Sequence, residues 1–281
     1  MLGQSSRPRT TLRTSLRARR FSRVAVLLLL ATPLSAADWT PPKNPDPNKI
    51  LTEAQEDTRA GRYADALAKH VWFYENALAY APAMYGVRLS FALSDWVSLA
   101  DAYPPALTKL ESVRDTAATR VREERNPQSA FHDFASINRE LKEQQRTTDL
   151  FLWLDSNRPD AARRVFGIAE PALVEAKEYK VCGQYLDPDE SYDLMVNAYR
   201  ENKRMAHDPA AGIGDSSKMM DRFADKSFST GGSTLVGLLV LNDRKADADR
   251  IAAEALKESD NPELRAMVGR ALKGELPPRW P

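Results

Sequence analysis

Apolar residues recur at helical spacing almost without interruption from Lys49 to Leu276, and no other feature of this chain restricts its fold as strongly. The stretch AGRYADALAKHVWFYENAL, residues 60 to 78, has the clearest pattern. One face of it follows the i, i+3, i+4, i+7 rule of a helix and consists of Tyr63, Ala66, Leu67, His70, Tyr74, Ala77 and Leu78. Val71, Trp72 and Phe73 lie off this face, so the helix needs neighbours on more than one side. Because no segment outside these helical stretches alternates as a half-buried strand does, we expect an all-α fold.

Glycine and proline separate the helical segments in the way that is typical of helical hairpins. Gly61 closes a helix that begins near Ile50, Tyr63 opens the next helix, and Pro82 follows its end. Weaker copies of this layout follow, with small residues at equivalent positions: Ala66, Ala106, Thr148, Cys182 and Ala248. Three of these small residues follow a tyrosine by three positions, after Tyr63, Tyr103 and Tyr179. The spacings of 40, 42, 34 and 66 residues are irregular but of hairpin size.

This arrangement resembles the tetratricopeptide repeat (TPR) family, whose 34-residue unit pairs two helices around small residues at their crossing points. The resemblance covers roughly residues 48–186 and 235–262 and rests on recurrence, since each single unit is a weak match. The chain departs from the family because the second helix of its first unit is about one turn longer and most units lack a glycine in the first helix. The resemblance implies a right-handed α-solenoid of about six stacked hairpins over residues 49–276, as in exported bacterial proteins of this type.

The last third of the chain contains further helix signals. Pro188, preceded by an aspartate, predicts the start of a helix over residues 190–208. The segment SKMMDRFADKSFSTGGSTLVGLLVL is interrupted by Gly231 and Gly232. Since a glycine inside a helix costs about 1 kcal/mol, two helices are favoured there over one. A final amphipathic helix follows Pro262, and its charged outer face suits the end of a stack.

Residues 1–36 have the composition of a cleavable export signal. Seven arginines and no acidic residue accompany the apolar run Val24 to Ala31, and small residues follow that suit cleavage after Ala36 or Ala37. Eight apolar residues are too few to span a bilayer, which needs about 20, so a signal peptide fits better than a membrane anchor. A mitochondrial transit peptide is the alternative, although such segments are amphipathic and this one ends in a leucine block. We expect an exported protein, periplasmic or secreted, in which residues 37–48 form a proline-rich, extended lead-in.

The charge and cysteine content exclude other classes of protein. The formal charge of +1 includes the seven N-terminal arginines; without them, 33 basic residues face 39 acidic ones, a balance of −6. An acidic body lacks the basic surface that nucleic-acid binding requires. The single cysteine, Cys182, permits no internal disulfide, and a buried packing role is favoured for it over a nucleophilic one.

Residues for metal or acid-base chemistry are sparse. The three histidines, His70, His132 and His207, do not pair at the i, i+4 spacing of a zinc helix. His70 falls on the apolar face and is expected to be a hydrogen-bonded core histidine. The glycine-containing stretches lack a preceding strand and the phosphate-binding lysine motif, so they predict neither a dinucleotide nor a phosphate site. We therefore expect no catalytic residue, cofactor or metal.

The TPR resemblance implies a function through a surface. In peptide-binding members, polar residues on the first helix of each unit line a groove, and the matching positions here are Gln55, Arg59, Arg88, Asp95, Asp133 and Asn138. We expect a non-enzymatic interaction or scaffold protein that binds a peptide or protein partner. The alternative is an enzyme of helical fold whose pocket joins His132, Asp133 and Asp95. A third possibility, a structural part of an envelope assembly, predicts exposed apolar patches at the ends of the array.

Overall fold

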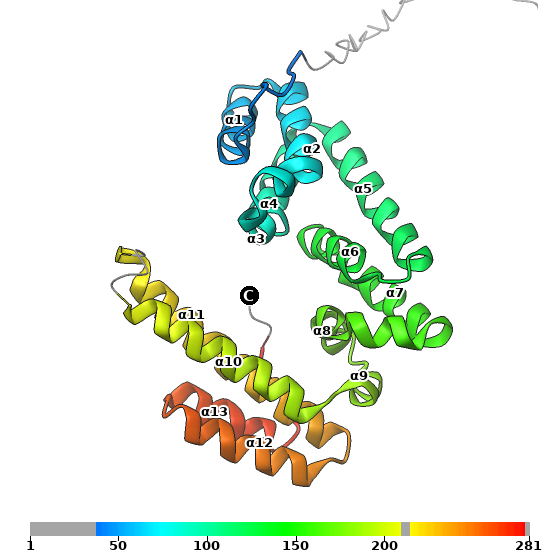
Figure 1. The fold of residues 1–281 in the computed structure, drawn as a ribbon. Coiled ribbons are helices and arrows are strands. Elements are labelled where there is room, and N and C mark those ends of the chain that lie inside the picture. Colours follow the sequence, from blue (N-terminus) through cyan, green and yellow to red (C-terminus); the bar gives the residue numbers. More distant parts are fainter. Residues whose placement is uncertain (1–37, 209–213, 279–281) are drawn as a thin grey trace, which may run out of the picture. The chain divides into compact units, whose positions relative to one another are not determined.

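The computed structural model describes residues 38–208 and 214–278, and every regular element in these ranges is a helix (Figure 1). The prediction of an all-α fold is therefore confirmed for this part of the chain. Ala37–Pro281 forms one compact unit. The expected signal peptide lies outside the described residues. None of the described helices is long and apolar enough to cross a membrane.

In chain order the helices are α1 (Pro47–Arg59), α2 (Tyr63–Tyr80), η1 (Pro82–Met84), α3 (Tyr85–Arg88), α4 (Phe91–Ala102), α5 (Pro104–Glu123), α6 (Gln128–Glu140), α7 (Gln144–Asn157), α8 (Pro159–Glu175), α9 (Tyr179–Tyr185), α10 (Pro188–His207), η3 (Gly214–Ser216), α11 (Ser217–Leu241), α12 (Lys245–Glu258) and α13 (Pro262–Ala271). The η elements are short 3₁₀ turns.

Four turns between helices share one backbone geometry. A residue with positive φ follows α1, α6, α8 and α11, namely Gly61, Lys142, Lys177 and Asp243. The next residue donates its N–H to a carbonyl five residues back, as Arg62 does to Asp57 at 2.9 Å. This bond satisfies a carbonyl that the helix end would leave free, while the left-handed residue reverses the chain. The following helix begins two residues after each left-handed residue.

Proline opens the helix at most of the other junctions. It stands at the start of η1, α5, α8, α10 and α13. The residue before it lies outside the helical region at all five starts, with ψ values between 64° at Arg158 and 122° at Asn261. Proline has no N–H to leave unsatisfied in a first turn and disfavours helical geometry in its predecessor, so it ends one helix and starts the next. The helix starts predicted at Pro188 and Pro262 are confirmed.

The small residues that the sequence places at helix crossings are all buried. Ala66, Cys182 and Ala248 each lie five residues after a left-handed turn residue. Counted in the same way, the residue of the third unit is Thr147 and not Thr148, although both threonines are buried. Among the tyrosines that precede them, Tyr63 and Tyr103 stack on each other with ring centroids 5.9 Å apart.

Each helix packs against the helices that precede and follow it in the chain. Several helices also pack against the second helix along, as α4 does against α6. α1 packs on α2, α4 on α5, α6 on α7 and α8 on α9, while α4 also contacts α1, α2 and α6, and α6 contacts α8. Beyond α9 the same holds, because α10 contacts α12 and α11 contacts α9, α12 and α13. The buried apolar residues accordingly fall into three clusters that follow the chain.

The prediction of a helix break at Gly231 and Gly232 is wrong, because α11 continues through both residues. The reason is packing against α10: a Cβ atom at Gly231 would lie 2.7 Å from Sδ of Met195. The serines and threonine beside the glycines are also buried. Close approach of two long helices thus outweighs the low helix propensity of glycine.

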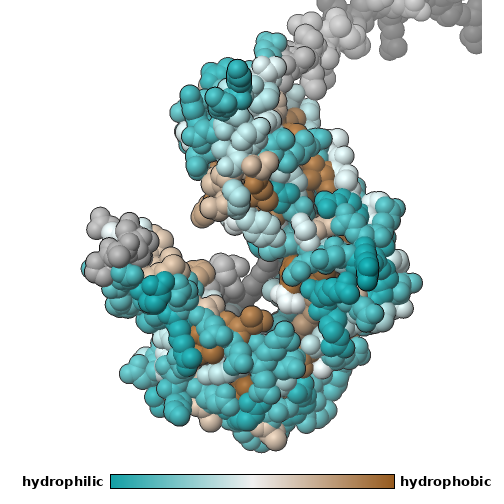
Figure 2. Space-filling view, in the orientation of Figure 1, coloured by the Kyte–Doolittle hydropathy of each residue, from teal (hydrophilic) through white to brown (hydrophobic). Residues whose placement is uncertain are grey.

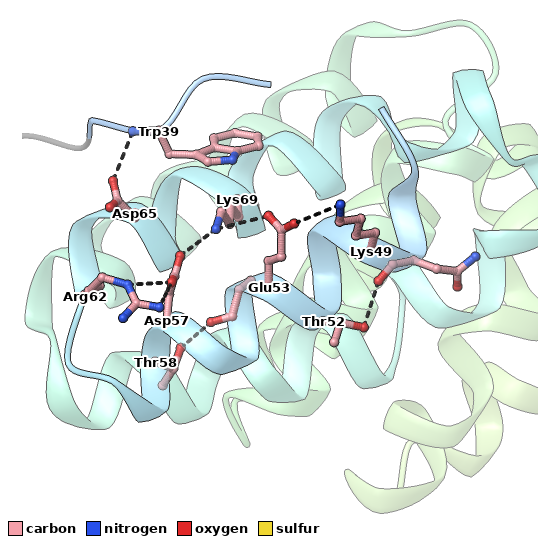
Figure 3. A network of polar contacts seen from close by, with 11 residues as sticks. Trp39, Lys49, Thr52, Glu53, Asp57, Thr58, Arg62, Asp65 and Lys69 are labelled. Carbon is pink, nitrogen blue, oxygen red and sulfur yellow. Dashed lines mark hydrogen bonds and ion pairs between the residues drawn. The ribbon is translucent and has the colours of Figure 1, made fainter. Parts of the chain in front are cut away.

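A buried ion-pair network joins α1 to α2 (Figure 3). Lys69 Nζ lies 2.7 Å from Asp57 Oδ2, and Arg62 also donates to Asp57. Burial raises the pKa of Asp57, but the hydrogen bonds from Lys69 and Arg62 outweigh it and hold that pKa below its ordinary value. At the start of the lead-in, the backbone N–H of Trp39 donates to Asp65 Oδ1 at 3.1 Å, and the Trp39 ring packs edge-on against Trp72.

Candidate functional site

Four of the six predicted partner-binding residues meet in pairs that link different hairpins. Gln55 of α1 donates from Nε2 to Asp95 of α4 at 2.7 Å. Arg88 of α3 donates from Nη1 and Nη2 to the two oxygens of Asp133 of α6, at 2.6 and 3.1 Å. Residues 40 and 45 positions apart in sequence are therefore neighbours in the fold, as expected if the first helices of successive units lie next to one another.

Arg88 and Asp133 form a buried pair. Only 9% of Arg88 and 4% of Asp133 is exposed. Arg88 also donates from Nε to the Tyr74 carbonyl at 2.7 Å, and its guanidinium lies 3.9 Å from the centre of the Tyr74 ring. Burial lowers the pKa of Arg88, but its bonds to Asp133 outweigh this and keep the pKa above its ordinary value. Arg88 is thus charged, and its contacts with Asp133 and Tyr74 tie α3 and α2 to α6.

Asn138 is also buried, with 0% exposed, and it donates from Nδ2 to Thr147 Oγ1 at 3.1 Å. The expectation that all six residues line an open surface is therefore wrong for Arg88, Asp133 and Asn138. Their side chains join helices to each other, because polar groups removed from water need partners within the protein. Arg59 is exposed, and Gln55 and Asp95 are half-buried, so these three remain accessible.

The three groups of the alternative enzyme site each have another partner. Asp133 binds Arg88, Asp95 accepts from Gln55, and His132 Nδ1 lies 2.9 Å from the Tyr85 hydroxyl. Burial lowers the pKa of His132, an effect that the negative charge of Asp133 opposes.

Sequence reasoning missed two exposed aromatic residues close to this region. Phe91, the first residue of α4, is 72% exposed, and Tyr85 of α3 is also exposed. Phe91 and Asp95 are four residues apart in one helix, so they share a face. Figure 2 shows apolar side chains at the surface over α3 and α4. The only signal for them was their place in the segment that follows Pro82, where the helical stripe is interrupted.

The other predicted chemical residues are packed into the core. His70 is buried as expected, but neither ring nitrogen has a hydrogen-bond partner among the described residues, so the expectation of a satisfied histidine is wrong. Burial lowers the pKa of His70 to about 4. Cys182 is fully buried, as predicted, and burial raises the pKa of its thiol to about 12. No group of three potential metal ligands occurs among the described residues.

In comparisons with protein-family models, with curated proteins and with solved structures, none matches this chain.

Proposed function

We propose that this protein is an exported, non-enzymatic helical-repeat protein, similar to TPR proteins, that binds a peptide or protein partner along the face formed by α1, α4 and α6. One observation carries this proposal: the first helices of successive hairpins contact one another in the series α1, α4, α6, α8. In a right-handed α-solenoid the first helices form such a row, and the row lines the binding groove.

The shared turn geometry supports the repeat interpretation. Three hairpins, α1–α2, α6–α7 and α8–α9, are closed by the same left-handed turn, and a buried small residue follows five positions later in each. Sequences as different as AGRY, LKEQ and AKEY adopt this geometry. A repeated backbone solution with buried crossing residues is what duplication of one helical unit predicts.

The proposed binding face combines apolar and polar groups. Phe91 supplies an exposed aromatic ring, and Arg59, Gln55 and Asp95 supply polar groups on the neighbouring turns of α1 and α4. Exposed aromatic residues surrounded by polar ones are characteristic of protein interfaces. The balance of −6 outside residues 1–37 modestly favours a basic partner, and added salt should weaken that preference.

Site-specific photo-crosslinking tests the binding face. Benzoylphenylalanine is placed at Phe91 and, as a matched control, at Leu194 of α10, which is 67% exposed. We expect a discrete crosslinked partner in the exported fraction from position 91, which disappears when Asp95 is also changed to lysine. Identical crosslinks from both positions would contradict the assignment of this face.

Export is tested separately by sequencing the N-terminus of the protein recovered outside the cytoplasm. We expect the mature chain to begin at residue 37 or 38, after cleavage following Ala36 or Ala37. An intact Met1 would contradict the signal-peptide proposal.

A further inference from the structure

Two backbone N–H groups at the start of the lead-in share one carboxylate oxygen of α2. The N–H of Asp38 donates to Asp65 Oδ1 at 2.9 Å, and the N–H of Trp39 donates to the same oxygen at 3.1 Å. Asp65 is the third residue of α2, and a helix dipole favours negative charge in the first turn. The two bonds therefore hold the backbone nitrogen of Asp38 beside a carboxylate that the helix itself keeps in place.

The side chain of Trp39 fastens the same point a second time (Figure 3). Its ring is half-buried and packs edge-on against Trp72, with ring centroids 6.5 Å apart. Lys69 Nζ lies 5.8 Å from the centre of the Trp39 ring. An aromatic ring held between another ring and a cation is a specific contact, so the position of the preceding residue is fixed by both backbone and side chain.

The sequence just before this anchor favours one of the two expected cleavage positions. Signal-peptide cleavage requires small residues at the first and third positions before the cut, as in the pattern A-x-A. A cut after Ala37 places Ser35 and Ala37 at these positions, whereas a cut after Ala36 places Leu34 at the third. The cut after Ala37 fits the pattern, and it makes Asp38 the first residue of the mature chain.

We propose that cleavage between Ala37 and Asp38 turns the Asp38 nitrogen into the mature N-terminus, and that Asp65 captures the new ammonium group as an ion pair. This inference rests on the export proposed above. In the hydrolysis, the oxygen of water joins the Ala37 carbonyl carbon and leaves a carboxylate, while the two protons of water convert the Asp38 amide nitrogen into an ammonium group. Hydrogen bonds from charged donors are roughly twice as strong as neutral ones, so processing strengthens a contact that already exists before the cut.

The surrounding charges leave Asp65 as the partner of this ammonium group. Lys69 is the cation of the cluster, and Glu53 and Asp57 offset its charge at 3.3 and 2.7 Å. Asp38 itself is exposed and contributes a further negative charge next to its own nitrogen. An ammonium group stabilised in this way has a raised pKa. Its contribution to stability is present below the ordinary α-amine value of about 7.7–8.0 and is lost as the pH rises through the folded value.

The cleavage position is tested by intact-mass and N-terminal analysis of the protein recovered outside the cytoplasm. We expect a chain that begins at Asp38. An exported chain that begins at Ala37, or at any other cleaved position, would overturn this inference while leaving the export proposal in place. An intact Met1 in that fraction would contradict both, so the two failures are distinguishable.

The capture by Asp65 is tested by the rate at which acetic anhydride acetylates the α-amine at pH 6.5, followed by mass spectrometry on the exported protein. Only the unprotonated amine reacts, so an ion pair that stabilises the ammonium form slows the reaction. We expect Asp65→Asn to react about two- to fivefold faster than the wild type, as for a surface ion pair. Asp160→Asn, at an exposed acid in the first turn of α8, is the matched control and should react at the wild-type rate.

A second comparison leaves Asp65 intact and moves the ammonium group instead. A chain that begins at Ala37, released from an amino-terminal fusion, retains the whole compact unit but carries its ammonium one residue away from Asp65. We expect its α-amine to react as fast as that of Asp65→Asn. Equal rates in the wild type and in a folded Asp65→Asn protein, checked by circular dichroism, or an equally slow reaction of the longer chain, would overturn the proposal.

Discussion

The buried pair of Arg88 and Asp133 provides the sharpest test of the structure, because the sequence placed both residues on an open surface. Replacing Arg88 with methionine keeps most of the apolar stem but leaves the Asp133 carboxylate buried without its two guanidinium bonds. Breaking a buried ion pair by removing one partner typically costs about 3–5 kcal/mol. Because whole domains are stable by about 5–15 kcal/mol, such a loss is readily measured.

Urea unfolding followed by circular dichroism gives the free energy of unfolding for each variant. We expect Arg88→Met to lose about 3–5 kcal/mol and the double variant Arg88→Met/Asp133→Leu to lose less, since apolar replacement of both partners leaves no buried charge. Arg59→Met is the matched control; its arginine is exposed, so its effect should stay within about 0.5 kcal/mol.

Two results would refute this reasoning. If Arg88→Met loses less than about 1 kcal/mol, the carboxylate of Asp133 reaches water and the pair is not buried as described. If the double variant loses as much as Arg88→Met and the single variant Asp133→Leu combined, the residues act independently and do not form a pair.

Three further predictions concern the core and the turns. Between about pH 6.5 and pH 4, His70 is neutral in the folded protein but protonated in the unfolded chain. The free energy of unfolding should therefore fall by about 3 kcal/mol as the pH drops through this range. Urea titrations at both pH values should show that His70→Phe removes this contribution. Gly183→Ala should cost about 1–3 kcal/mol of stability, because the added Cβ would lie 2.2 Å from Oδ1 of Asn242. Gly167→Ala has open space around it and should stabilise the protein by up to about 1 kcal/mol. A similar shift of the melting temperature in both variants would contradict this account. Lys142→Gly should stabilise by about 0.5–1 kcal/mol, because φ is +59° there, and a lower melting temperature would show that the lysine is not strained.

Periodicity identified the helices because burial of one face repeats every three to four residues wherever a helix packs. This rule alone predicts the helix that begins at Tyr63 and the helices that Pro188 and Pro262 open. It also predicts the burial of three small residues, Ala66, Ala106 and Cys182. Turn positions without glycine were harder to predict. Lys142, Lys177 and Asp243 adopt the left-handed conformation that the sequence indicates only at Gly61.

The tertiary structure decided matters that depend on contacts between segments distant in the chain. Whether Gly231 breaks a helix depends on how closely α10 approaches it, and local propensity carries no information about that neighbour. Whether Arg88 faces solvent or a carboxylate depends on the position of Asp133, 45 residues away. Whether Asp38 and Trp39 are held or free likewise depends on Asp65, 27 and 26 residues away. The sequence by itself thus determined where most of the helices lie and which face of each is apolar, since these are largely local properties. Only the packing of those helices decided whether α11 continues through its glycines, which polar groups are buried together and which remain accessible to a partner.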